Sequence, residues 1–262
     1  MHIIILSLLA GIIGTGLGGL LTTFFGNRTE KMISIFLSFA GGVMISIVFL
    51  ELIPESAEYV NMGVTSAGLV LGAALVLFLN KIMDKISSTN KIQQKLHDSY
   101  AEFFHASEMF DSKKNMLRSG MILLFAIALH NIPEGLALGA SGYHDAPLGL
   151  TLAIIIGLHN IPEGMAVCAP LIAGGLSKTK AVLTTLLAGA TTVIGAFIGV
   201  MVGGISDFAL ALSFSMAGGA MLYVVLGEIL PQSIITNKDR VPTIFALVGI
   251  IAGMLVPLGI FP

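Results

Sequence analysis

The chain has 262 residues and a formal net charge of −2, and 55% of its residues are hydrophobic while only 11% are charged. Soluble globular chains carry about 25% charged residues, so this composition excludes an ordinary soluble protein. No basic patch suggests nucleic acid as a partner. The single cysteine, Cys168, excludes both a disulfide framework and a thiolate metal cluster.

Apolar residues fall in runs near or above the roughly 20 residues that a helix needs to cross a bilayer. Backbone groups in lipid have to be satisfied internally, and runs of this length achieve that as helices. We expect an all-α integral membrane protein with eight transmembrane helices, forming a single transmembrane domain over residues 1–262 with a cytoplasmic loop at about 83–116. The expected spans are 2–26, 31–54, 63–82, 117–142, 147–174, 180–203, 206–232 and 241–261.

The thirteen Lys and Arg residues all lie in or beside alternate connections, after spans one, three, five and seven. Positive residues favour the cytoplasmic side of a membrane. This pattern predicts a multi-pass protein of the inner or plasma membrane with both termini outside. The first positive residues, Arg28 and Lys31, follow the first apolar run, so we expect that run to be a retained span and not a cleaved signal peptide.

The long polar segment at 83–116 follows the third span, on the side where the Lys and Arg residues place the cytoplasm. It contains His97 and His105. A solvated connector is the first interpretation. A weak metal-holding loop is the alternative, although two scattered histidines do not make a His-rich tract.

Two sequence motifs occur twice, in spans that run in opposite directions. Residues 40–56 contain AGGVM and ELIPES, and residues 217–233 contain AGGAM and EILPQS. The motif LHNIPEG occupies residues 129–135 in the fourth span and residues 158–164 in the fifth. Inverted repeats are a common build of secondary transporters, whose substrate site lies near the midplane where the repeats meet. We therefore expect a 3+2+3 inverted-repeat bundle with spans four and five on the pseudo-two-fold axis.

His130 and Glu134 are four residues apart, so on a helix their side chains lie on one face, one turn apart. Asn131 lies on an adjacent face, and the missing N–H of Pro133 predicts a kink that frees the carbonyl of Leu129. Imidazole nitrogen and carboxylate oxygen are suitable ligands for Zn²⁺, and also for Fe²⁺ or Mn²⁺. The fifth span repeats the arrangement with His159, Asn160, Pro162 and Glu163. Two facing spans can therefore offer two imidazoles and two carboxylates to a metal ion.

The two glutamates of these motifs have no fixed positive partner, because every Lys and Arg lies near a cytoplasmic end of a span. A charge at the bilayer centre costs roughly 2.5–3.5 kcal/mol on insertion scales, so two ionised glutamates cost on the order of 5–7 kcal/mol. Protonation or a mobile cation would remove this cost, and the duplicated pairing of His with Glu favours the cation. Hydrogen bonding from helix to helix is the structural alternative, but it gives no reason for the same proline to recur.

The doubled HNIPEG motif, the eight-span plan and the Lys-bearing loop after span three resemble the ZIP (Zrt-, Irt-like) divalent metal transporters, particularly the short bacterial ZupT-like branch. The resemblance covers essentially the whole chain. It implies uptake of divalent metal into the cytoplasm, with the metal as transported substrate and with no cofactor. It implies a first metal site that consists of His130, Glu134, His159 and Glu163. It also implies a second, adjacent site in which Asn131 and Asn160 join the two motif glutamates.

Thr192, beside Thr191, stands where many members of that family carry a carboxylate in span six as a further ligand of the second site. A hydroxyl is a weak neutral ligand, so we expect the second site to be weaker or absent and the metal preference to shift. The His-rich loop that is frequent in the family is also missing. Glu51 and Glu55 near the outer end of span two, and Glu228 near the inner end of span seven, could attract ions at entry and accept them at exit. Ordinary interfacial carboxylates are the alternative.

A transporter of divalent metal ions is therefore the leading hypothesis, with Zn²⁺ first and Fe²⁺, Mn²⁺, Co²⁺ or Cd²⁺ as further candidates, and an enzyme is not expected. A membrane metalloenzyme is the alternative, although no HExxH sequence occurs and a di-iron cluster would prefer Glu-x-x-His pairs. A proton-coupled carrier of organic solutes is a third class. The expected partners are metal ions and the lipid bilayer, and a homodimer is a further candidate assembly.

Overall fold

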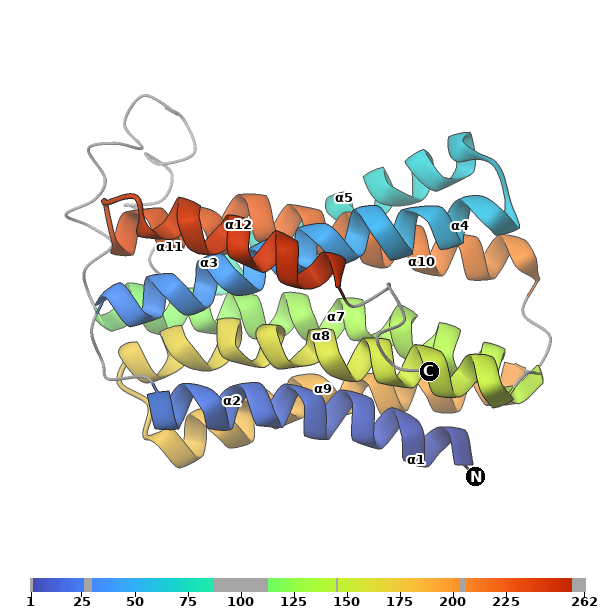
Figure 1. Ribbon diagram of the computed structural model, residues 1–262, viewed down its shortest axis with the longest axis horizontal. Helices are drawn as coiled ribbons and strands as arrows, with labels where there is room; N and C mark the ends of the chain where they lie inside the picture. The colour runs from blue at the N-terminus through green and yellow to red at the C-terminus, as the bar shows by residue number, and fades with distance from the viewer. Residues whose placement is uncertain (1, 26–29, 87–112, 145, 203–205, 256–262) are drawn as a thin grey trace.

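A computed structural model describes residues 2–25, 30–86, 113–144, 146–202 and 206–255, and every regular element in these ranges is a helix. The predicted bundle of eight spans is confirmed. Six stretches are long and apolar enough to cross a membrane, and Met62–Phe78 and Val241–Met254 are shorter apolar helices. The elements in chain order are α1 His2–Leu8, η1 Leu9–Ile13, α2 Gly14–Phe25, α3 Glu30–Ile47, η2 Val48–Leu52, α4 Ile53–Tyr59, α5 Met62–Ile86, α7 Lys113–His144, α8 Ala146–Ala173, α9 Lys178–Val202, α10 Asp207–Val224, η5 Val225–Ile229, α11 Leu230–Thr236 and α12 Val241–Met254 (Figure 1).

The helix ends differ from the expected span ends by several residues. The second span continues through α4 to Tyr59 and the seventh through α11 to Thr236, both beyond the expected ends at 54 and 232. The helices α5 and α7 both extend into the expected loop of 83–116. His97 and His105, and with them the expectation of a metal-holding loop, lie outside the described residues.

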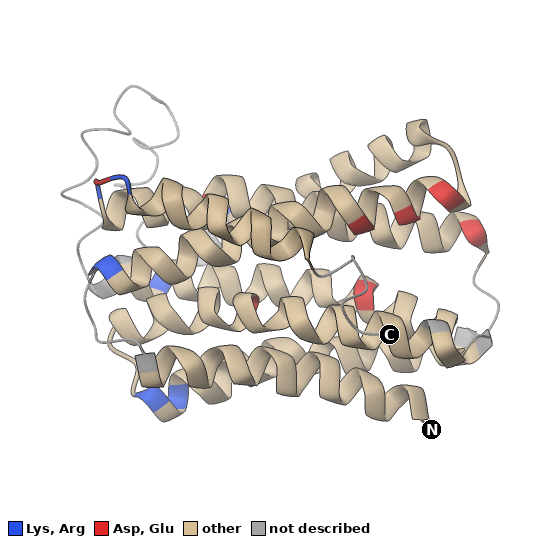
Figure 2. Cartoon of the chain, viewed as in Figure 1, with Lys and Arg blue, Asp and Glu red and all other residues tan. Residues whose placement is uncertain are grey.

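Charged residues separate toward the two ends of the bundle. Figure 2 shows Lys and Arg gathered at one end, where α9 and α12 begin, and most Asp and Glu toward the other end, where α4 and α10 lie. At the basic end Nζ of Lys178 donates a hydrogen bond to the carbonyl of Thr23 at 2.7 Å. The tendency of positive residues to face the cytoplasm assigns the basic end to that side.

Glycine contacts show that the first and last three spans are inverted copies. Corresponding residues are 177 positions apart, as in Gly42 and Gly219 (219 − 42 = 177). Gly42 lies so close to the backbone carbonyl of Ala246 that a Cβ atom would overlap it, and Gly219 lies in the same way against Leu69. These two carbonyls are also 177 positions apart (246 − 69 = 177). The predicted 3+2+3 plan is therefore confirmed by contacts as well as by sequence.

The first span, α7, α8 and α9 pack backbone against backbone. Gly18 of α2 meets the carbonyl of Ile161 in α8, and Gly195 of α9 meets that of Ile132 in α7. Residues without a bulky side chain let membrane helices approach this closely. We call these four spans the glycine-packed group.

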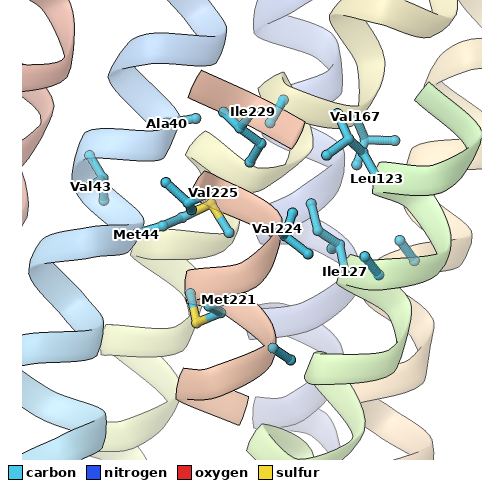
Figure 3. Close-up of a cluster of buried hydrophobic side chains, with 14 of the residues drawn as sticks. Ala40, Val43, Met44, Leu123, Ile127, Val167, Met221, Val224, Val225 and Ile229 are labelled. Carbon is cyan, nitrogen blue, oxygen red and sulfur yellow. The ribbon is translucent and has the colours of Figure 1, made fainter. Parts of the chain in front are cut away.

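Apolar side chains join the glycine-packed group to spans two and seven. Figure 3 shows Met44 of α3 and Met221 of α10, which are again 177 positions apart, in the space between these two helices. Both belong to the same buried cluster as side chains of α7 and α8. Leu123 and Ile127 precede the HNIPEG motif of α7, and Val167 follows that of α8. The contact is a dense cluster of buried apolar side chains, and the residues that Figure 3 labels make no side-chain hydrogen bonds to one another.

Three spans contain a π-helical turn that the sequence analysis did not predict. The turns η2 and η5 occupy equivalent positions in the two copies, since 225 − 48 and 229 − 52 both equal 177. The turn η1 lies in the first span, and its counterpart region in α9 is regular α-helix. Single π-helical turns insert one residue into an α-helix and are frequent at functional sites.

Candidate metal centre

The helices α7 and α8 carry the two HNIPEG motifs near their middles and pack against each other (Figure 1). Both helices continue past their motif prolines, so Pro133 and Pro162 lie inside helices and do not end them. The six side chains that the sequence predicts as ligands are all buried. Their exposed fractions are 1% for His130, 0% for Asn131, 2% for Glu134, 1% for His159, 0% for Asn160 and 0% for Glu163.

The histidines and glutamates pair reciprocally between the two helices. With the ring proton on Nε2, His130 donates to Oε1 of Glu163 at 3.0 Å, and His159 donates to Oε2 of Glu134 at 3.3 Å. Each pair joins the histidine of one motif to the glutamate of the other. The side-chain hydrogen bonds of the two helices therefore follow the same inverted relation as the helices themselves.

Three of these side chains could hold one metal ion together. Ligand atoms of His130, Glu134 and Glu163 all lie within 4.8 Å of one another. Nitrogen and oxygen ligands of a tetrahedral Zn²⁺ are about 3.3 Å apart, so the three side chains have to move closer together to bind one ion. His159 adjoins this group through its hydrogen bond to Glu134.

Several polar atoms of the centre have no hydrogen-bond partner among the described residues. They include Nδ1 of both histidines, Oε1 of Glu134 and Oε2 of Glu163. A buried polar atom without a partner costs about 1–3 kcal/mol, and more when it is charged. A divalent cation between the carboxylates would remove much of this cost.

The two motif asparagines are oriented by backbone carbonyls of neighbouring spans. Nδ2 of Asn131 donates to the carbonyl of Ala188 at 3.2 Å, and Nδ2 of Asn160 donates to that of Ala10 at 3.0 Å. Because each amide nitrogen is used in this way, each Oδ1 is left as an acceptor, and neither has a partner among the described residues. Oγ1 of Thr192 is likewise buried and without a partner there.

The π-helical turn η1 explains one irregularity in this arrangement. Thr15 and Thr192, whose carbonyls face equivalent glycines of α8 and α7, are 177 positions apart (192 − 15 = 177). Ala10 and Ala188, the two asparagine acceptors, are 178 apart (188 − 10 = 178). The extra residue that η1 inserts between Ala10 and Thr15 accounts for the difference. The amide contact is therefore equivalent in space although its numbering is shifted.

The pathway residues suggested by the sequence lie in spans two and seven. Glu51 belongs to η2 and is close enough to His159 and Glu134 for their charges to interact. Glu55, one turn further out, is half-buried beside other groups of α4. Glu228 belongs to η5 and accepts a hydrogen bond from Nδ2 of Asn80 at 3.1 Å.

Sequence reasoning missed two kinds of contact at this centre. Asn80 was not singled out, because a lone asparagine near the end of a span belongs to no motif. The carbonyls of Ala10 and Ala188 have no sequence signature either, since any residue carries a carbonyl. Only the duplication itself could have directed attention to them.

Comparison with known proteins places the chain beside zinc transporters. The model of the family described as "ZIP Zinc transporter" matches residues 89–260. A protein of Chlorobium chlorochromatii named "Zinc transporter ZupT" is 33% identical over 96% of this chain and 93% of its own length. Proteins of the same name from Clostridium perfringens and Corynebacterium glutamicum are 31% and 34% identical, over 96% of this chain and 92% and 94% of their own lengths.

Proposed function

The chain belongs to the ZIP zinc transporter family, and we propose that it carries divalent metal ions, Zn²⁺ first among them, across a membrane into the cytoplasm. The transported ion occupies the centre between α7 and α8. Its ligands are His130, Glu134 and Glu163, with His159 beside them. Membership of a transporter family favours this function over a membrane metalloenzyme.

One observation carries the proposal: two buried carboxylates pair with two histidines, and no Lys or Arg of the described residues forms an ion pair with them. The described Lys and Arg residues gather at one end of the bundle, away from the middle of α7 and α8 (Figure 2). Two uncompensated charges at this depth cost on the order of 5–7 kcal/mol. A divalent ion balances both carboxylates at once and satisfies the ring nitrogens as well.

Binding of the ion requires the protons of the two His–Glu pairs to leave. Imidazole coordinates metal in its neutral form through a nitrogen without a proton, so metal and proton compete for the same atoms. The centre is also buried on all sides in the conformation described, with exposed fractions of at most 2% for its ligands. Entry and exit therefore require the spans around it to move, and this conformation corresponds to an occluded state.

We propose that the second site, formed by Asn131, Asn160 and the two shared glutamates, is weak in this chain. Its further oxygens are two amides and the hydroxyl of Thr192, all neutral. One divalent ion already balances the two carboxylates, so a second ion would leave two positive charges buried. We expect one metal ion per chain by elemental analysis of purified protein, and a second in Thr192→Asp. A second ion in the unaltered protein would contradict this assignment.

We also propose that Glu51 and Glu55 receive ions at the outer end and that Glu228 accepts them at the inner end. The clustering of acidic residues at the end opposite the Lys and Arg residues supports this direction (Figure 2). Negative charge around an entrance raises the local concentration of cations.

The single-domain organisation, the cytoplasmic loop near 83–116, both termini outside and assembly into a homodimer remain parts of this proposal. Exposed apolar side chains on α5 and α12, such as Val70, Phe78, Leu247 and Ile251, suit contact with lipid or with a second copy. Cross-linking in native membranes distinguishes the two. A single band at the mass of one chain would contradict the dimer.

The test of function is uptake of radioactive zinc into bacterial cells that lack their own zinc importers. Unlabelled Zn²⁺, Fe²⁺, Mn²⁺, Co²⁺ and Cd²⁺ compete in turn, which ranks the metals. His130→Ala and Glu163→Ala are expected to abolish uptake, whereas the exposed carboxylate variant Glu58→Gln retains it. Unchanged uptake in both site variants, with all proteins present in the membrane in equal amounts, would overturn the proposal.

A further inference from the structure

The π-helical turns η2 and η5 have the same backbone in the two repeats and carry a glutamate at the same place. Glu51 is the fourth residue of Val48–Leu52, and Glu228 is the fourth residue of Val225–Ile229. A proline follows each glutamate three positions later, in α4 and α11. The two carboxylates therefore start from equivalent places on either side of the pseudo-two-fold axis.

Hydrogen bonds beyond the two turns confirm that equivalence. Oγ of Ser56 donates to the carbonyl of Ala211 at 2.8 Å, and Oγ of Ser233 donates to the carbonyl of Ser34 at 2.8 Å. Both donors and both acceptors are 177 positions apart (233 − 56 and 211 − 34). The segments that follow the glutamates are thus held to the opposite repeat in the same way.

Glu51 lies near enough to the metal centre for its carboxylate to interact electrostatically with groups there. Its charge interacts with those of His159 and Glu134, and α3, the helix that leads into η2, packs against α8. Oε1 of Glu51 is buried and has no hydrogen-bond partner among the described residues. It therefore offers a further carboxylate near the two motif glutamates, with an acceptor atom that has no partner among the described residues.

Glu228 accepts a hydrogen bond from α5, in the third span. Its Oε1 accepts a hydrogen bond of 3.1 Å from Nδ2 of Asn80, which lies near the basic end of α5. The position that corresponds to Asn80 in the other repeat is Pro257 (80 + 177 = 257), whose side chain has no hydrogen-bond donor. The hydrogen bond from Asn80 to Glu228 is thus encoded in one repeat only, and it distinguishes two glutamates that the backbone places equivalently.

We propose that Glu51 and Glu228 serve the transported ion in turn, and that Asn80 is a positioning residue that holds Glu228 until the ion moves inward. The inference rests on the proposed transport function. In the occluded state Glu51 offers its carboxylate on the side of His159 and Glu134. When the ion moves toward the basic end, Glu228 gives up its bond to Asn80 and takes the equivalent role beside His130 and Glu163.

In this mechanism the two glutamates act at different steps of transport. Steady-state uptake distinguishes these steps through the half-saturating zinc concentration and the maximal rate. In cells, initial zinc uptake is measured against zinc concentration for Glu51→Gln, Glu228→Gln and the exposed control Glu58→Gln. We expect Glu51→Gln to raise the half-saturating concentration roughly tenfold with little change in maximal rate. We expect Glu228→Gln to lower the maximal rate roughly tenfold with little change in half-saturation. A tenfold effect corresponds to about 1.4 kcal/mol, within the reach of one nearby charge.

Asn80 is tested through its dependence on Glu228. Asn80→Ala removes the donor, so release of Glu228 becomes easier and the maximal rate is expected to rise roughly threefold. In the Glu228→Gln background the same substitution is expected to have no effect, because coupled residues are non-additive. Glu51→Asp and Glu228→Asp keep the charge and are expected to restore much of each loss, which a purely structural role would not show.

The outcomes separate this inference from the proposed function. Absence of zinc uptake by the unaltered protein would remove the proposed function itself. If the unaltered protein takes up zinc, two results would overturn the alternation alone. In the first, Glu51→Gln and Glu228→Gln both behave like Glu58→Gln. In the second, both variants change the same kinetic constant. An Asn80→Ala effect that persists in the Glu228→Gln background would overturn the role of Asn80.

Discussion

The α7–α8 pair and the η2–η5 pair come from the same kind of duplication, yet their side-chain contacts differ. In the first pair each histidine bonds to the glutamate of the other motif, and each asparagine bonds to a carbonyl of an outer span. In the second pair the backbone turns match, but Glu51 interacts electrostatically with the metal centre while Glu228 bonds to Asn80. In the proposed mechanism, residues on the pseudo-two-fold axis share one ion and stay equivalent. Residues away from the axis would serve opposite sides of the membrane, so their contacts can differ.

The equivalence of α7 and α8 is tested most strongly at the histidines. His130→Ala and His159→Ala are each expected to lower zinc uptake by roughly 100-fold, since even residues that only support ligands cost 10–100-fold. Initial uptake rates, normalised to protein in the membrane, check this. A large loss in His130→Ala beside a small loss in His159→Ala would show that only one half of the centre binds the ion.

The equivalence of the packing around the centre is tested at two glycines. Gly18→Ala and Gly195→Ala each push a Cβ atom into a backbone carbonyl and are expected to destabilise the protein by about 1–3 kcal/mol. Thermal unfolding in detergent measures the loss. The matched control is Gly19→Ala, where the added atom would meet Thr185 at 3.5 Å, an ordinary contact. Equal stability of Gly18→Ala and Gly19→Ala would contradict the close packing of the first span on α8.

The competition between metal and protons is expected to show in the pH dependence of uptake. Unperturbed histidine protonates near pH 6.5, and its protonated form cannot bind metal. Uptake by the unaltered protein should therefore fall as the external pH drops through this range, by up to about tenfold per pH unit for each proton displaced. A flat profile would count against ligation by His130 and His159.

The smallest effect is expected at the outer acidic residues. Glu55 is half-buried and lies one turn beyond Glu51, so it acts on the ion only through charge. Glu55→Gln is expected to raise the half-saturating zinc concentration about twofold at low ionic strength, and less at high ionic strength because salt screens exposed charges. An effect that is independent of salt would point to a direct ligand role instead.

Sequence reasoning predicted those parts of the molecule that follow from apolar run length or from a repeated motif. The eight spans follow from apolar length, and the central His–Glu pairing follows from the duplicated motif. The π-helical turns were missed because no residue in VFLEL or VLGEI marks them, and they become visible only in the hydrogen bonds of the helix. The electrostatic interaction of Glu51 with His159 was missed for a related reason. The position of a residue near the outer end of a span indicates its depth but not which other spans it approaches.

The burial of the metal centre affects which ions can bind there and be transported. Ligands that are at most 2% exposed leave little room for a hydration shell, so an ion has to exchange nearly all its water for nitrogen and oxygen atoms of the protein. Magnesium is hard to dehydrate and requires octahedral coordination by oxygen, whereas zinc binds four ligands that can include imidazole. Burial therefore discriminates against magnesium, because its hydration shell has to be removed before the ion can bind.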